Sequence, residues 1–250
     1  MGFSYTIADA DNCFSAAVIY SFSPGMDATA LAKQFAEIFQ HENYLQQSFK
    51  KTTLVWSFPE SILVPHELMK ADAGAEMLNL VYGNAAGGAV RSDFIYQHNL
   101  HNVYRIPEAI ANGLPSSFQY AGQTHQYSLL AQLPEKTGAH LLAVFYSHHV
   151  TLVLSKEGKL QVIRNFVYRD AEEAAFHLLN VCENFSVSPE EVAVHLNGMI
   201  DKDSNLYASL YKYFLNMEFE TLPGTTTCTG EIKNYPTHFF SHLFAQALCV

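Results

Sequence analysis

The residues of this sequence that most invite a chemical interpretation are its histidines, because an imidazole can transfer protons or bind a metal ion near neutral pH. The chain contains 12 of them in 250 residues. Ser147, His148 and His149 follow one another and could do acid–base work or bind a metal from one turn. Neighbouring residues of a strand point to opposite faces, so the two imidazoles can serve one site only if the turn is irregular. We favour the simpler interpretation, a surface turn with one half-buried histidine.

Two other histidine pairs have spacings that occur in metal sites. His98 and His101 fall in a predicted strand or loop, where they do not share one helical face. His238 and His242 are four positions apart in a helix predicted after Pro236, a spacing that can chelate zinc. The glutamate of a zinc hydrolase is missing between them, no third ligand is indicated, and the surrounding residues are largely apolar. We interpret this pair as structural or interface residues and predict no metal site.

No catalytic residue is predicted, because the common catalytic and phosphate-binding motifs do not occur. The sequence lacks a Gly-x-Ser-x-Gly nucleophile elbow, a Walker phosphate loop and a Cys-x-x-Cys pair. Gly87 and Gly88 lie in a loop of small residues without a helix start behind them, so they do not form a phosphate cradle. We expect a flexible connection or a close approach of backbones at this loop.

Composition and charge limit the classes of partner. Asp and Glu number 24 against 14 Lys and Arg, which gives a formal net charge of −10. Nucleic acid and anionic membrane surfaces are therefore not expected as partners, since both require clustered cations. No apolar run approaches the ~20 residues of a membrane span, and no signal peptide is visible. The four cysteines lie far apart and are interpreted as reduced thiols of a cytoplasmic protein.

The elements that must position these residues follow an order that occurs twice. Two β-rich runs at 3–7 and 14–20 flank a turn-forming cluster and predict a hairpin. A helix capped by Asp27 and a strand at 52–58 come next. The second half repeats this order at an offset of roughly 140 to 150 residues. Its members are a hairpin over 150–168, a helix with Asp170 and Glu173 in capping-box-like spacing, and a strand at 192–196.

The second half contains one strand more than the first. Residues 140–146 precede its hairpin and predict a three-stranded meander, whereas the chain begins directly at the first hairpin. A meander followed by helices and further strands describes the ribonuclease-H-like, actin-like fold. We therefore expect an α/β protein of two pseudo-duplicated lobes, 1–136 and 137–250, of which the first lacks its first strand and the second carries a C-terminal helix. The alternative is that two unrelated α/β segments happen to look alike.

A resemblance to a known family rests on stretches that are spread over nearly the whole chain. They are Gly2–Tyr5, Ser61–Pro65, Leu141–Tyr146, Lys159–Tyr168 with its following helix, His195–Gly198 and His238–Cys249. In pattern and order they resemble a bacterial family known only as domain-of-unknown-function family 3822, whose fold is actin-ATPase-like. None of the stretches is a catalytic signature. Family members usually carry one more strand ahead of the first hairpin, so the resemblance also implies an incomplete first sheet.

The resemblance implies where a nucleotide would bind. An actin-like ATPase holds it between its halves, with two Asp-x-Gly turns around the phosphates and a Gly-Gly segment facing the adenosine. The turn of the first half is acidic and free of glycine, that of the second half is filled by bulky side chains, and the adenosine segment has one glycine instead of two. We therefore do not expect ATP hydrolysis. The candidates for lining the cleft between the lobes are Asp9, Asp11, Ser147, His148, Asn197 and Gly198.

Surface features remain as the source of function. Aromatic residues make up 13% of the chain, and residues 207–217 give one predicted helix an aromatic stripe. Such a stripe usually belongs to a core, and the alternative is an exposed interaction face. An edge strand of a shortened first sheet could also accept a strand from a partner.

Our favoured hypothesis is a catalytically inactive actin-like scaffold of the bacterial cytoplasm. It would act through protein–protein interaction, with an unidentified protein or a second copy of itself as partner, and would need no cofactor. The alternative is a nucleotide-binding protein or weak ATPase that holds ATP and magnesium in the cleft between the lobes. A third hypothesis is a small-molecule hydrolase that uses His148 or His149.

Overall fold

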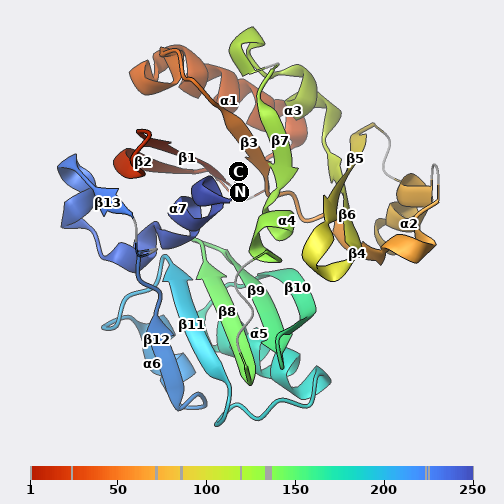
Figure 1. Cartoon of the computed structure of the whole chain (residues 1–250), viewed down its shortest axis with the longest axis vertical. Helices are drawn as coiled ribbons and strands as arrows, with labels where there is room; N and C mark the ends of the chain where they lie inside the picture. Colours follow the sequence, from red (N-terminus) through yellow and green to blue (C-terminus); the bar gives the residue numbers. More distant parts are fainter. Residues whose placement is uncertain are drawn as a thin grey trace. The chain divides into compact units, whose positions relative to one another are not determined.

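The structure is a computed structural model that describes residues 2–23, 25–70, 73–84, 87–118, 120–132, 137–222, 224 and 226–249. The chain forms two compact units (Figure 1). The middle unit consists of residues 22–132, and the terminal unit combines residues 2–21 with 133–250. Contacts thus group the N-terminal hairpin with the C-terminal half of the chain, and the lobe limits 1–136 and 137–250 stay a prediction.

A five-stranded sheet is the framework of the terminal unit. Its strand order is β10-β9-β8-β11-β12. The first three strands along the chain form the predicted antiparallel meander, and β11 lies parallel to both β8 and β12. The strands are β8 (Ala139–Phe145), β9 (His149–Lys156), β10 (Lys159–Val167), β11 (Ala193–Gly198) and β12 (Asn216–Phe219).

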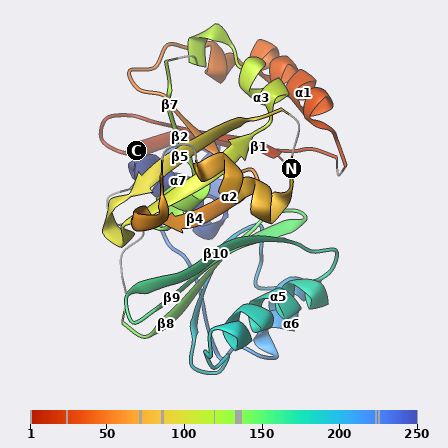
Figure 2. The same ribbon diagram turned by 90° about the vertical axis from the view of Figure 1, so that its right-hand side faces the viewer.

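Alternating apolar residues decide which face of this sheet is buried. Leu141 and Phe145 of β8 are completely buried and share one face, because every second side chain of a strand points the same way. On that face they pack with Leu178 of helix α5 (Ala171–Asn184). Helix α6 (Asn205–Tyr211) covers the same face (Figures 1 and 2). The core of the terminal unit therefore lies between the sheet and these two helices.

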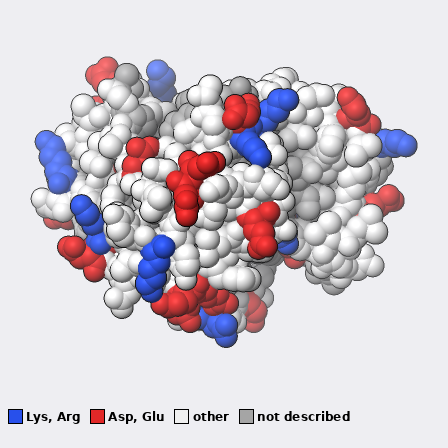
Figure 3. All heavy atoms as spheres, turned by 90° about the horizontal axis from the view of Figure 1, so that it is seen from below, with Lys and Arg blue, Asp and Glu red and all other residues white. Residues whose placement is uncertain are grey.

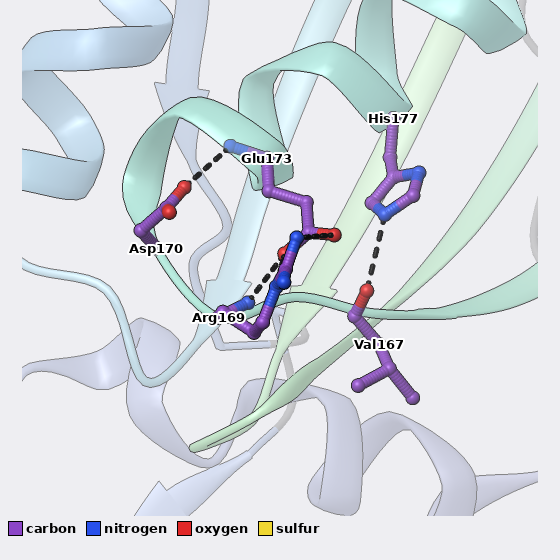
Figure 4. Close-up of polar contacts among 5 residues, drawn as sticks. All are labelled: Val167, Arg169, Asp170, Glu173 and His177. Atoms are coloured by element: carbon purple, nitrogen blue, oxygen red, sulfur yellow. Dashed lines mark hydrogen bonds and ion pairs between the residues drawn. The ribbon is translucent and has the colours of Figure 1, made fainter.

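Helix α5 begins where the capping signal predicts. Asp170 is its N-cap residue, and the Asp170 carboxylate accepts the backbone N–H of Glu173 at 2.8 Å. Glu173 in turn accepts the backbone N–H of Arg169 at 2.8 Å and pairs with the Arg169 guanidinium at 3.0 Å (Figure 4). The hydrogen bond from Arg169 lowers the pKa of Glu173. In the usual capping box the glutamate returns to the N-cap amide, so this carboxylate reaches one residue further.

The substitution Asp170→Ala is expected to lower the free energy of unfolding by about 1 kcal/mol, because an orphan N–H at the start of α5 loses its acceptor. Asp203→Ala is the matched control, since it removes an exposed carboxylate near a helix start that another residue, Ser204, caps. Its effect is expected to stay within about 0.5 kcal/mol. Urea unfolding followed by circular dichroism measures both, and equal losses would argue against the cap.

The N-terminal hairpin belongs to a second, smaller sheet of the terminal unit. Its strand order is β1-β2-β13, with β1 antiparallel and β13 parallel to β2. Phe14 of β2 packs on Phe244 of helix α7, with ring centroids 4.2 Å apart. A small apolar core thus attaches the C-terminal helix to the hairpin. These elements are β1 (Gly2–Ala8), β2 (Cys13–Ser21), β13 (Thr227–Cys228), the 3₁₀ helix η5 (Gly230–Asn234) and α7 (Ser241–Leu248).

The C-terminal helix begins later than the prediction from Pro236 places it. A 3₁₀ turn, η6 (Thr237–Phe239), comes first, so His238 lies in this turn and does not share a helical face with His242. Phe240 occupies the N-cap position of α7 and makes no capping hydrogen bond from its side chain. No local signal therefore marks the true start of this helix.

The middle unit contains two sheets. β5, β6 and β4 form an antiparallel sheet of order β4-β6-β5, and β3 pairs parallel with β7. Asp27 caps helix α1 as predicted, accepting the backbone N–H of Ala30 at 2.8 Å. The strands and α-helices are α1 (Ala28–His41), β3 (Thr53–Trp56), β4 (Ser61–Pro65), α2 (Ala73–Tyr82), β5 (Ala89–Ile95), β6 (Leu100–Ile106), α3 (Glu108–Asn112), β7 (Gly122–His125) and α4 (Gln126–Leu130). The 3₁₀ helices are η1 (Asn43–Gln46), η2 (His66–Leu68), η3 (Tyr96–His98) and η4 (Ser116–Phe118).

Asp93 of β5 is the centre of a polar network in the middle unit. One carboxylate oxygen accepts hydrogen bonds from the Thr124 hydroxyl at 2.9 Å, the His125 backbone N–H at 2.7 Å and the Ser128 hydroxyl at 2.6 Å. The other accepts the Tyr104 hydroxyl at 3.1 Å. Burial lowers the pKa of His125 to about 4, so this imidazole is neutral at pH 7. We interpret the network as structural, because the carboxylate is satisfied by donors of the fold itself.

On the face shown in Figure 3, lysine and arginine side chains are scattered and form no broad basic patch. In the described part of the chain, no helix combines the length and the apolar character needed to cross a membrane.

Candidate functional site

Four of the six predicted site residues lie at the edge of the five-stranded sheet that is formed by the carboxyl ends of β8 and β11. Ser147 and His148 follow β8, whereas Asn197 and Gly198 end β11, and these two strands are adjacent and parallel. The chain leaves β8 toward β9 and leaves β11 toward β12, on opposite sides. In open α/β sheets, ligands bind outside the carboxyl ends of the strands at such a switch point. This edge of the terminal unit is therefore the candidate functional site.

Gly198 ties the two strands together. Its φ of +79° lies in the left-handed region, and a Cβ atom added there would stand 2.2 Å from the carbonyl oxygen of Phe145. The next residue, Met199, donates its backbone N–H to the same oxygen at 2.8 Å. Glycine is thus required here by the close approach of two backbones. The close approach explains why position 198 is a glycine without any role in binding adenosine, the role that the sequence analysis considered for it.

The turn after β8 uses much of its backbone within the fold. The N–H of Tyr146 donates to the carbonyl of His149 at 2.8 Å, and the N–H of Tyr168 donates to the carbonyl of His148 at 3.0 Å. The Tyr168 hydroxyl donates to the carbonyl of Tyr146 at 2.6 Å. The side chains of Ser147 and His148 are exposed, and that of His149 is half-buried. This arrangement agrees with a surface turn that carries one half-buried histidine.

Ser147 connects this turn to the end of β2 and to the residue that follows β11. Its Oγ lies 3.2 Å from the Oγ of Ser21, the last residue of β2, and donates to the sulfur of Met199 at 3.5 Å. Neither neighbour is an imidazole or a carboxylate. The contacts therefore position the serine without activating its hydroxyl as a nucleophile.

Helix α7 packs against the carboxyl ends of β8 and β11. The backbone N–H and the Nδ1 of His242 lie 3.3 and 3.0 Å from the Oδ1 of Asn197, a buried residue of β11. The ring of Tyr146 stacks on that of His149 at 4.4 Å between centroids and meets the His242 ring edge-on at 5.5 Å. In the preceding 3₁₀ turn η6, His238 Nε2 lies 2.7 Å from the carbonyl oxygen of Ile200. The rings of Tyr146, His149 and His242 thus pack together beside Asn197 at the carboxyl ends of β8 and β11.

Two imidazoles of this site, those of His149 and His242, are neutral at physiological pH. Burial lowers the pKa of His242 to about 3 and that of His149 to about 4. The Nδ1 of His242 faces the acceptor Oδ1 of Asn197, so Nδ1 carries the proton and Nε2 the lone pair. This Nε2 is buried without a hydrogen-bond partner among the described residues. A second proton there would be a buried, unpaired charge, which explains the direction of the shift.

The structure does not bring Asp9 and Asp11 to this edge. They lie at the closed end of the β1–β2 hairpin, whereas Ser21, which contacts Ser147, lies at the open end opposite Gly2. About 20 Å of strand separate the two ends. The Asp9 carboxylate accepts the backbone N–H groups of Asp11 and Cys13, both at 2.9 Å. Asp9 therefore stabilises its own turn.

A second polar cluster lies toward the opposite ends of the same strands. His140 of β8 and His195 of β11 approach to 2.9 Å between Nδ1 and Nε2, and the Nδ1 of His195 lies 2.8 Å from Glu218 and 3.1 Å from Glu220. No sequence motif indicates this cluster, because its members come from three separate segments. Within the ranges that the structure describes, no group of three or more His, Cys, Asp or Glu residues could hold a metal ion.

Comparison with known proteins assigns a family. The model of a family described as "Protein of unknown function (DUF3822)" matches residues 1–217. No curated protein matches the sequence.

Solved structures identify the fold. A Bacteroides thetaiotaomicron protein with actin-like ATPase fold and unknown function is 16% identical, with a TM-score of 0.76 over 98% of this chain and 91% of that one. A chain of a PilM–PilN type IV pilus biogenesis complex is 14% identical, with a TM-score of 0.57 over 99% of this chain and 94% of that one. These likenesses establish a mixed α/β protein with the actin-like ATPase fold, as the order of elements predicted.

Proposed function

We propose that this chain, which belongs to the family of proteins of unknown function DUF3822, is a catalytically inactive actin-like scaffold that binds another protein. The scaffold needs no cofactor and acts in the cytoplasm. The four cysteines lie far apart in the sequence, a pattern that we interpret as reduced thiols of a reducing compartment. A second copy of the chain is the other partner that we consider.

One observation carries the proposal of inactivity. At the switch point between β8 and β11, where this fold class receives its ligand, the Asn197 carboxamide already binds His242 of helix α7. Tyr146 and His149 stack beside it, and both histidines are neutral. A triphosphate needs backbone N–H groups and cations at such an edge, and this edge offers neutral, packed rings instead.

A structural neighbour supports the choice of a protein as partner. The PilM–PilN complex contains a chain of the same fold and is a type IV pilus biogenesis complex. That neighbour indicates that an actin-like fold can serve in an assembly of proteins. The inference for this chain rests on fold analogy.

Isothermal titration with Mg-ATP tests the first half of the proposal. We expect no saturable heat of binding up to about 1 mM nucleotide. A complex that stays unsaturated at this concentration has a binding free energy weaker than about −4 kcal/mol. Saturable binding at micromolar concentrations would refute the proposed loss of nucleotide binding. It would support the alternative, a nucleotide-binding protein or weak ATPase. The alternative draws on the exposed Ser147 and His148, whose side chains remain accessible at the turn.

Affinity capture from the native host tests the second half. We expect a reproducible partner, identified by mass spectrometry, that also binds the purified chain directly in a titration. Light scattering on the purified chain reports whether a second copy is the partner. A chain that stays monomeric and captures no protein that binds it directly would contradict the scaffold.

A further inference from the structure

The middle unit contains a cavity of about 320 Å³, a volume at the small end of ligand sites. Its apolar lining includes Trp56 at the end of β3 and Ile106 at the end of β6, both buried. Its polar lining comes from Arg91 of β5, Asn112 of α3 and Gln123 of β7. The part of this lining that solvent reaches is mainly polar, and the side chains of Arg91 and Asn112 are exposed.

Arg91 and Gln123 present hydrogen-bond donors to this cavity. The indole N–H of Trp56 lies 3.3 Å from the Oε1 of Gln123, and an indole can only donate. Gln123 must therefore turn its oxygen toward Trp56, which leaves the two N–H groups of its amide for another acceptor. Arg91 adds a permanent cation, and no carboxylate is among the residues that line the cavity.

The guanidinium of Arg91 has no carboxylate partner among the described residues. The Arg91 guanidinium is exposed and forms no side-chain hydrogen bond or ion pair with a residue that the structure describes. The nearest carboxylate along the strand is that of Asp93, two positions further, and both of its oxygens already accept hydrogen bonds from the polar network described above. The guanidinium thus keeps its donors for a ligand.

We propose that this cavity binds a carboxylate group. Arg91 forms a bidentate pair with the carboxylate, and Gln123 donates to it. The volume admits a free dicarboxylate such as succinate or the side chain of a glutamate in a partner peptide. This inference does not depend on the scaffold function, because it concerns a different unit of the chain.

The single tryptophan of the chain is a built-in reporter, since Trp56 lines the cavity. Tryptophan fluorescence is recorded while succinate, or a blocked Leu-Glu-Leu peptide, is added at constant ionic strength. We expect a saturable change below about 10 mM of one or both probes. Saturation by succinate alone identifies a free dicarboxylate as the ligand, and saturation by the peptide alone identifies an acidic residue of a partner.

The variant Arg91→Gln is expected to weaken binding at least about tenfold, because a charge-assisted pair is lost. Arg164→Gln is the matched control, since it removes an arginine of β10 in the terminal unit and should bind the probe like the parent protein. The midpoint of urea unfolding is measured for both variants to exclude loss of fold. Absence of a saturable change with either probe, or unchanged binding by Arg91→Gln, would overturn the proposal.

Discussion

The variant Gly198→Ala is expected to lose about 3 kcal/mol or more of its free energy of unfolding. A left-handed conformation costs a residue with a Cβ about 1–2 kcal/mol. The larger part comes from the clash, because the new Cβ would lie 2.2 Å from the Phe145 carbonyl oxygen, which belongs to the backbone of the adjacent strand. To relieve it, β8 and β11 must separate at their carboxyl ends, and the Met199 N–H would lose its acceptor.

Gly138→Ala separates these two causes. Gly138 also lies in the terminal unit with a positive φ, +86°, but an added Cβ would meet no atom of the described residues within 4 Å. We therefore expect it to lose only about 1 kcal/mol, the conformational cost alone. Urea unfolding of both variants measures the difference. Similar losses would show that the strands at Gly198 adjust freely, and the site would then be more open to a ligand than the packing indicates.

Local chemistry explains why the order of elements could be predicted from the sequence. Asp27 and Asp170 each accept an N–H of the first turn of a helix, as their position before an amphipathic segment indicates. The meander of residues 139–167 follows from alternating apolar residues and a turn at Glu157 and Gly158. Such signals lie within a few residues of the structure that they determine.

Contacts between distant segments explain what the sequence did not show. The bond between Asn197 and His242 joins residues that lie 45 positions apart, and the contact of Ser21 with Ser147 spans 126 positions. The first makes the C-terminal helix part of the candidate site. The second determines which end of the N-terminal hairpin lies near that site. The sequence analysis placed Asp9 and Ser147 in one site, because a hairpin pattern does not indicate which of its two ends lies near a distant segment. The contact between Ser21 and Ser147 shows that the open end, and not the turn with Asp9, lies there.

Acidification is expected to destabilise the terminal unit well before its carboxylates titrate. In the unfolded chain His242 takes up a proton near pH 6.5, whereas in the folded chain burial lowers its pKa to about 3. The unfolded state therefore binds more protons than the folded state between these values. The contribution of the neutral imidazole is complete above about pH 7 and is lost as the pH falls, by about 1.4 kcal/mol per pH unit. His149, with a pKa of about 4, acts in the same direction.

The variant His242→Gln tests this assignment, because a glutamine amide does not titrate and can still donate to Asn197. Between about pH 7 and pH 5, where Asp and Glu remain mostly ionised, its stability should fall less steeply than that of the parent protein. At about pH 5 the expected difference in pH-dependent loss is about 2 kcal/mol. The measurement is urea unfolding at a series of pH values.

Phe244→Leu is the matched control on the same helix. It weakens the packing of α7 on Phe14 and lowers stability at every pH, but it removes no titrating group. Its curve of stability against pH should therefore run parallel to that of the parent protein. If His242→Gln also gave a parallel curve, His242 would be solvated in the folded state, and the edge between β8 and β11 would have room for water or a ligand. A shallower curve for His242→Gln alone supports a closed site, which is the physical basis of the proposed loss of nucleotide binding.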